Sequence, residues 1–92
     1  MTYAVVQTRR FARAYKRLHG NPVVKVDAAI SRVAADPGLG ERRKGDLAAL
    51  RVHKFQALGQ LWLLGYSVDD AVRLIYLEAA GRHENFYRDL RR

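Results

Sequence analysis

Residues 61–66 read Leu-Trp-Leu-Leu-Gly-Tyr and, with their neighbours, form the longest apolar stretch of the chain. An almost continuously apolar run of this length is typical of a β-strand that is covered on both faces. The run is far shorter than the roughly 20 residues that a membrane-spanning helix needs. We therefore expect residues 61–66 to be a central strand, and we expect no association with a membrane.

Two further strands are expected beside this one, at residues 50–55 and 72–79. Segments of turn composition separate them, at residues 56–59 and 67–70. Connections this short join antiparallel strands, so the second half of the chain should be a three-stranded antiparallel meander. Side chains alternate along the first of these strands, with Arg51, His53 and Phe55 on one face and Leu50, Val52 and Lys54 on the other.

The first half of the chain predicts one strand and two helices. Residues 3–8 combine β-branched residues with an aromatic one, which is typical of a short strand. From Arg9 the apolar residues fall at helical spacing until His19-Gly20 ends the helix. Asn21-Pro22 then supplies an N-cap and a first helical residue for a second helix, which Asp36-Pro37-Gly38 stops. The expected buried positions are Phe11, Tyr15 and Leu18 in the first helix and Val26, Ile30 and Val33 in the second.

The expected fold class is α+β. An N-terminal strand and an αα-hairpin precede the meander, which completes a four-stranded sheet. Residues 37–46 should be a polar loop, and residues 84–92 a short C-terminal helix. We expect the hairpin to cover one face of the sheet and the other face to be partly open. The chain has 92 residues and no evident linker, so residues 1–92 should form a single domain.

The composition favours a polyanionic partner in the cytoplasm. Seventeen Lys and Arg residues against nine Asp and Glu give a net charge of +8, which attracts nucleic acid or an acidic protein. The chain has no cysteine, so disulfides and thiolate zinc sites are excluded, as suits a reducing compartment. The first eight residues lack the basic and apolar regions of a signal peptide.

Residues 81–87 place reactive side chains at the expected end of the last strand. Arg82 and His83 follow Gly81, and Tyr87 comes four residues after the histidine. A cation, an imidazole that titrates near neutral pH, and a phenol are groups suited to phosphodiester chemistry. This segment is the most concentrated set of such groups in the sequence.

Two motifs and the order of elements resemble a known family. The motifs are Leu47-x-x-Leu50-Arg51-Val52 at the entry to the meander and Gly81-x-His83-x-x-x-Tyr87 at its exit. Together with the strand–helix–helix–three-strand order, they resemble the RelE/ParE superfamily of bacterial toxins from type II toxin–antitoxin systems, over essentially the whole chain. The resemblance implies a co-encoded acidic antitoxin that wraps the toxin with a partly disordered segment.

The resemblance also implies a choice of activity. One branch of the superfamily cleaves messenger RNA on the ribosome, and another poisons DNA gyrase without being a nuclease. We expect the first activity, that of an endoribonuclease (an mRNA interferase) that inhibits translation and arrests growth. The alternatives are a gyrase poison and a decayed toxin that only binds its antitoxin. The three histidines are isolated and lack zinc-ligand spacing, so we expect metal-independent acid–base cleavage with no cofactor.

RNA cleavage through the 2′-hydroxyl needs a base, an acid and cations for the phosphate. We expect His83 to be the acid and Arg82 to clamp phosphate with its guanidinium group. By resemblance, Tyr87 orients or stacks on a base, while Arg51 holds phosphate and His53 acts as the base. Four of these residues also have a structural alternative. His83 could cap a turn, and Tyr87 could pack the terminal helix. Arg51 could be a solvated strand cation, and His53 could be a half-buried core histidine.

Four further cations are expected to bind RNA without taking part in the chemistry. Arg43 and Lys44 lie in the polar loop, Arg73 opens the last strand, and Lys54 points away from Arg51 and His53 unless a bulge reverses it. One feature departs from the messenger-RNA-cleaving relatives, which commonly carry an arginine in the middle strand. Residues 60–66 contain no cation, and this departure favours the gyrase-poison alternative.

Overall fold

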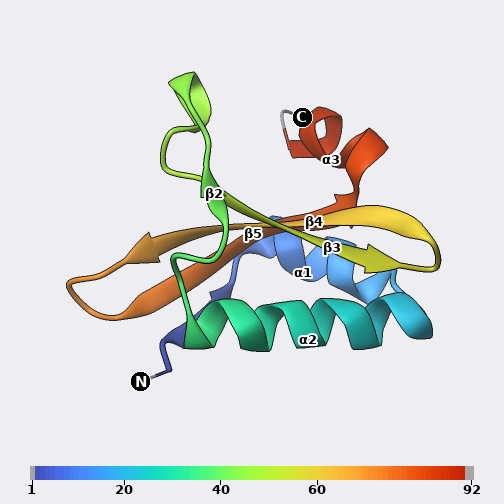
Figure 1. Ribbon diagram of the computed structural model, residues 1–92, viewed down its shortest axis with the longest axis horizontal. Coiled ribbons are helices and arrows are strands. Elements are labelled where there is room, and N and C mark those ends of the chain that lie inside the picture. Colours follow the sequence, from blue (N-terminus) through green and yellow to red (C-terminus); the bar gives the residue numbers. More distant parts are fainter. Residues whose placement is uncertain (1, 91–92) are drawn as a thin grey trace.

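The chain folds into one five-stranded mixed sheet with helices on both sides (Figure 1). This computed structural model describes residues 2–90. The strand order across the sheet is β1-β5-β4-β3-β2, which confirms the predicted α+β class and element order. The elements are β1 (Ala4–Gln7), α1 (Arg9–Lys16), α2 (Asn21–Ala35), β2 (Glu41–Arg42), the 3-10 helix η1 (Gly45–Leu47), β3 (Arg51–Ala57), β4 (Gln60–Asp69), β5 (Leu74–Arg82) and α3 (His83–Leu90).

Strand β4 is the centre of the sheet, as its apolar run predicts. It pairs with β3 on one side and β5 on the other, and both pairings are antiparallel. Leu64 and Tyr66 point into a core shared with α1 and α2, whereas Leu63 points into a second core shared with α3. Both leucines are fully buried. The two faces of β4 therefore define two layers of packing.

Helices α1 and α2 cover one face of the sheet (Figure 1). The Thr8 side chain caps α1 by accepting a hydrogen bond from the Phe11 amide. Gly20, at a φ of 68°, separates the two helices. Pro22 follows at the start of α2. The predicted αα-hairpin is confirmed, and its buried residues include Phe11, Val26 and Val33.

Helix α3 covers part of the opposite face (Figure 1). Phe86 is buried there against Gly65 of β4, where an added Cβ would lie 2.7 Å from Phe86 Cζ. Leu50 and Val52 complete this smaller core. The C-terminal helix is confirmed up to Leu90, and the expected residues 91 and 92 lie outside the described residues.

The sheet has one strand more than the four that were predicted. Within the expected polar loop 37–46, Glu41 pairs with Val52 and Arg42 with Arg51, both antiparallel. The Arg43 amide then donates to the Leu50 carbonyl at 2.9 Å. The backbone groups at the edge of β3 need hydrogen-bond partners, and this charged segment supplies them by pairing as a strand. A two-residue strand of Glu and Arg carries no hydrophobic periodicity that would reveal it.

Strand β5 pairs with β1 along only half of its length. β1 is parallel to β5 and matches Leu74–Leu77, and the Thr8 amide and hydroxyl both donate to the Leu77 carbonyl. Beyond that point β5 continues to Arg82 beside β4 alone. A register shift opposite Gly65 and Tyr66 marks a bulge in β5 at Glu78. The far half of β5 therefore forms an edge of the sheet.

A buried tyrosine fixes the segment between α2 and β2 to the sheet. The Tyr66 hydroxyl accepts a hydrogen bond from the Gly40 amide at 2.8 Å and donates to the Pro37 carbonyl at 2.7 Å. An added Cβ at Gly40 would lie 2.8 Å from the same oxygen, so only glycine allows this approach. One side chain of β4 thus positions the chain that leads into β2.

Replacing Tyr66 with Phe should destabilise the protein, because it leaves the Gly40 amide and the Pro37 carbonyl without their partner. We expect a loss of about 1–3 kcal/mol in the free energy of unfolding, measured by urea denaturation. The matched control is Tyr15→Phe, which removes an exposed hydroxyl that donates to Asp27 and should cost about 0.5 kcal/mol or less. Equal losses in the two variants would contradict a special role for Tyr66.

Candidate functional site

Three of the five predicted catalytic residues lie where β5 passes into α3. Arg82 is the last residue of β5, and His83 is the first residue of α3. Tyr87 follows four positions later, so it shares one side of the helix with His83. His83 is exposed and Tyr87 is half-buried, with its ring edge against Phe86 at a centroid distance of 5.0 Å. The structure brings the imidazole and the phenol to one side of α3, and their catalytic roles stay predictions.

The side chain of Arg43 links this region to the segment after β2. Its guanidinium group donates to the Tyr87 hydroxyl at 3.0 Å and to the Glu41 carboxylate at 3.1 Å. The Arg43 Nε atom is buried and has no protein partner among the described residues. This arginine was expected to attract RNA in general. That role stays a prediction, and its observed contact holds the phenol of Tyr87 in place.

Arg51 and His53 lie on the opposite side of the sheet, facing α2. Arg51 donates to the Gly40 carbonyl at 2.9 Å. The His53 ring stacks on Phe55, a residue that packs against the core under α1 and α2. Burial lowers the pKa of His53, and the nearby Arg32 of α2 lowers it further. The structure therefore does not bring this pair together with His83 and Tyr87, and their catalytic roles stay predictions.

Lys54 lies on the α3 side of the sheet, as strand alternation predicts. It is exposed and pairs in register with Leu63, whose side chain lies in the core under α3. The neighbouring positions on this face of β3 and β4 are neutral, including Gln56, Leu61 and Ser67. Lys54 is the one cation that β3, β4 and β5 place on this face, and these strands lie wholly within the described residues.

The other predicted phosphate-binding cations lie apart from one another. Arg82 donates to the Gln60 side chain at 3.4 Å and forms an ion pair with Glu84 at 3.5 Å. Arg73 lies in the β4–β5 turn at a φ of 53°. A strand rises about 3.3 Å per residue, so Arg73 is roughly 30 Å from Arg82 along β5. Lys44 is exposed in the segment between β2 and η1. No single phosphate could reach all three.

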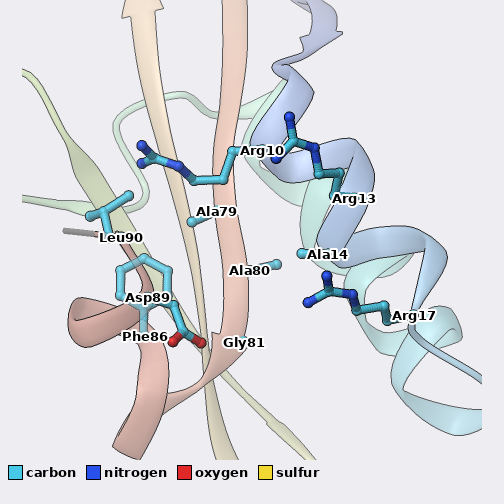
Figure 2. Close-up of a pocket in the computed structure, with 10 residues that line it drawn as sticks. All are labelled: Arg10, Arg13, Ala14, Arg17, Ala79, Ala80, Gly81, Phe86, Asp89 and Leu90. Atoms are coloured by element: carbon cyan, nitrogen blue, oxygen red, sulfur yellow. The ribbon is translucent and has the colours of Figure 1, made fainter. Parts of the chain in front are cut away.

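A groove between α1 and α3 was not predicted from the sequence. Figure 2 shows Arg10, Arg13 and Arg17 of α1 on one side of it and Asp89 of α3 on the other. Its volume is about 330 Å³, and its floor is the 79–81 stretch of β5. The arginines take the polar positions of an amphipathic helix and were not among the predicted site residues. Their spacing of three and four residues is the signal that could have indicated a common face.

The described part of the chain has neither a cluster of metal ligands nor a helix that could span a membrane. Between residues 2 and 90, no three His, Asp or Glu side chains gather as metal ligands would. None of the described helices is long and apolar enough to cross a membrane.

Comparisons with known proteins identify one family and one fold. A family profile described as "ParE-like toxin of type II bacterial toxin-antitoxin system" matches residues 5–91. A search of curated protein sequences gave no match. A double arginine-to-alanine mutant of the Escherichia coli toxin RelE in the free state has a TM-score of 0.73 and 15% sequence identity, over 91% of this chain and 86% of that chain.

Two solved complexes have a similar fold. The toxin–antitoxin complex RelBE2 from Mycobacterium tuberculosis gives a TM-score of 0.72 at 17% identity, over 90% of this chain and 100% of that chain. The intact E. coli RelBE toxin–antitoxin complex gives 0.71 at 15% identity, over 86% and 94% of the two chains. At these identities the likeness shows the fold.

The lowered pKa of His53 makes stability depend on pH. The folded state favours the neutral imidazole, so protonation favours the unfolded chain as pH falls below about 6.5, the usual pKa of histidine. This contribution to stability is complete above that pH and is lost as pH falls towards the lowered pKa. Urea unfolding of the wild type and of His53→Gln, at pH 7.5 and at pH 5, should show a smaller loss in the variant. Equal losses would mean that His53 titrates alike in both states.

Proposed function

Because the chain belongs to the ParE-like toxin family of type II bacterial toxin–antitoxin systems, we propose that it arrests growth by binding and trapping DNA gyrase, without cutting RNA. The observation that carries this proposal is the small number of cationic side chains on the sheet face beside α3. That face of β3, β4 and β5 offers Lys54 as its one strand cation. A toxin that acts by binding needs no acid–base pair there.

The positions of the two strand residues support a binding mode over a catalytic one. General acid–base cleavage needs an acid, a base and a cation within hydrogen-bond reach of one phosphate. Arg51 bonds to the Gly40 carbonyl and His53 stacks on Phe55, both on the α2 side. The sheet itself separates them from His83 and Tyr87. On the α3 side, a nuclease reaction would have to take its base from a carboxylate, either Glu41, which is paired with Arg43, or Glu78, which accepts a hydrogen bond from Ser67.

We also propose that a cognate acidic antitoxin neutralises this toxin. The two RelBE structures are toxin–antitoxin complexes whose toxins share this fold. The chain carries a net charge of +8, which favours a partner of opposite charge and makes the affinity sensitive to salt.

A second candidate function is the messenger-RNA endoribonuclease acting on the ribosome. The observation that favours it is the arrangement on α3, where His83 and Tyr87 share one side and the Arg43 guanidinium holds the Tyr87 hydroxyl at 3.0 Å. In this alternative His83 would be the acid and Tyr87 would orient a base. Lys54 and Arg82 would supply positive charge, and the roles of Arg51 and His53 would have to pass to other groups.

Inducing the chain in bacteria without an antitoxin separates the two candidates. We expect growth arrest with stalled gyrase–DNA cleavage complexes and an SOS response, while mapped transcript 5′ ends stay unchanged. His83→Ala should retain this toxicity, because substitution of an exposed side chain costs about 0.5 kcal/mol or less. The matched control is His19→Ala, which removes an exposed histidine at the other end of the sequence.

New transcript 5′ ends on ribosomes would contradict the binding mode. The nuclease alternative further requires that His83→Ala lowers cleavage by about 10²–10⁴-fold, the usual contribution of a general acid, while His19→Ala does not. Absence of any arrest would point to the decayed-toxin alternative.

A further inference from the structure

The outer edge of β1 has backbone groups without partners. β1 is the first strand of the sheet, and the Thr8 amide at its end donates to the Leu77 carbonyl of β5. Amide directions alternate along a strand, so the backbone groups of Val5 and Gln7 point away from β5. Among the described residues, the amides of Val5 and Gln7 have no hydrogen-bond partner. A row of such groups is a template for pairing with another strand.

β1 also lacks the features that usually prevent such pairing. The strand at the opposite edge of the sheet, β2, has only two residues, and both are charged. β1 has four residues, Ala-Val-Val-Gln, with no charge and no proline, and its pairing with β5 shows no bulge. Val5 is 36% exposed and Val6 is 43% exposed. An uncharged edge with exposed valines favours the addition of a further strand.

The same edge of a second copy satisfies these groups. In an antiparallel pairing with a two-fold axis beside Val6, Val5 of each copy lies opposite Gln7 of the other. The amide and carbonyl of Val5 then bond with the carbonyl and amide of Gln7, twice over because of the symmetry. The two copies of Val6 face each other as a non-hydrogen-bonded pair, in which side chains lie closest. This register leaves neither outward amide without a partner.

The charges at the two ends of β1 are complementary in this arrangement. At its start, the Tyr3 hydroxyl donates to the Asp70 carboxylate at 2.7 Å, and Asp69 is also exposed there. At its end come the exposed Arg9 and Arg10, in a helix with no acidic residue in its first turn. The antiparallel register places Arg9 opposite Tyr3 of the second copy, within reach of Asp70. A parallel pairing would place arginines beside arginines.

We propose that β1 pairs with β1 of a second copy of this chain, so that five strands from each copy form one continuous sheet across a two-fold axis. The net charge of +8 on each copy opposes the association. The pairing surface is also small, so the dimer is weak and reversible. The inference goes beyond the proposed function, and it requires no particular activity of the toxin.

The first test uses single cysteines, because the chain has none of its own. Facing residues of a non-hydrogen-bonded pair have Cα atoms about 4.5 Å apart, which a disulfide can bridge. Val6→Cys should therefore form a disulfide-linked dimer under mild oxidation. We expect it to form at least about tenfold faster than in Val24→Cys and Val72→Cys, measured by non-reducing electrophoresis. These controls lie outside β1 and are more exposed, at 63% and 64%, so random collision favours them. Equal rates in the three variants would overturn the proposal.

A cysteine at the neighbouring position tests the register. In the proposed pairing, the two copies of Val5 are diagonal neighbours, roughly 7–8 Å apart, which is too far for an unstrained disulfide. Val5→Cys should therefore crosslink much more slowly than Val6→Cys. A Val5→Cys variant that crosslinks as fast as Val6→Cys would overturn the two-fold register. Circular dichroism of each variant checks that it is folded.

Reversal of charge tests the orientation of the two copies. Arg9→Glu and Asp70→Lys each make two symmetric contacts repulsive, so each should weaken self-association by about fivefold or more in sedimentation velocity. An equimolar mixture of the two variants restores opposite charges at both contacts and should recover the dimer. The matched control is Lys25→Glu on α2, an exposed cation outside β1 whose reversal should not weaken association. A mixture that associates no better than either variant alone would overturn the antiparallel arrangement.

Discussion

Burial of β4 on both of its faces is the constraint on which the rest of the fold depends. Leu64 and Tyr66 require a cover on one face and Leu63 requires one on the other, so two separate layers must pack on a single short sheet. The αα-hairpin supplies the first layer and α3 supplies the second. Gly65 makes the second layer possible, since any larger residue would collide with Phe86. The segment after α2 is held in turn by the hydroxyl of Tyr66.

Much of this architecture could be predicted because its signals are local. Capping at Thr8, the break at Gly20 and the proline at the start of α2 place the two helices. The apolar run of β4 identifies the central strand. β2 could not be predicted in the same way, because pairing with the edge of β3 creates it and its two residues are both charged. The sequence indicated a C-terminal helix but not how that helix covers the second face of the sheet. That cover depends on the burial of Phe86 against Gly65, which only the tertiary structure brings together.

The positions of the candidate site residues could be predicted from the sequence only in part. Alternation along β3 correctly predicted that Lys54 lies on one face of the sheet and that Arg51 and His53 lie on the other. Alternation does not indicate which of the two faces α2 covers. That depends on how the hairpin docks, so His53 was expected near His83 and instead lies beside Phe55. The groove escaped prediction for a similar reason. Arg10, Arg13 and Arg17 look like a solvated helix surface until the far half of β5 is placed beside them.

The pairing of the first strand with the last has a consequence for how the chain folds. Ala4 matches Leu74 and Gln7 matches Leu77, so about 70 residues must be closed into a loop before these hydrogen bonds can form. Hairpins such as β3–β4 close short loops and form early, whereas β1 has no partner until β5 has been synthesised. The five-stranded sheet is therefore complete only after residues 74–77 have left the ribosome. Until then a nascent chain exposes β1 as a strand without its neighbour.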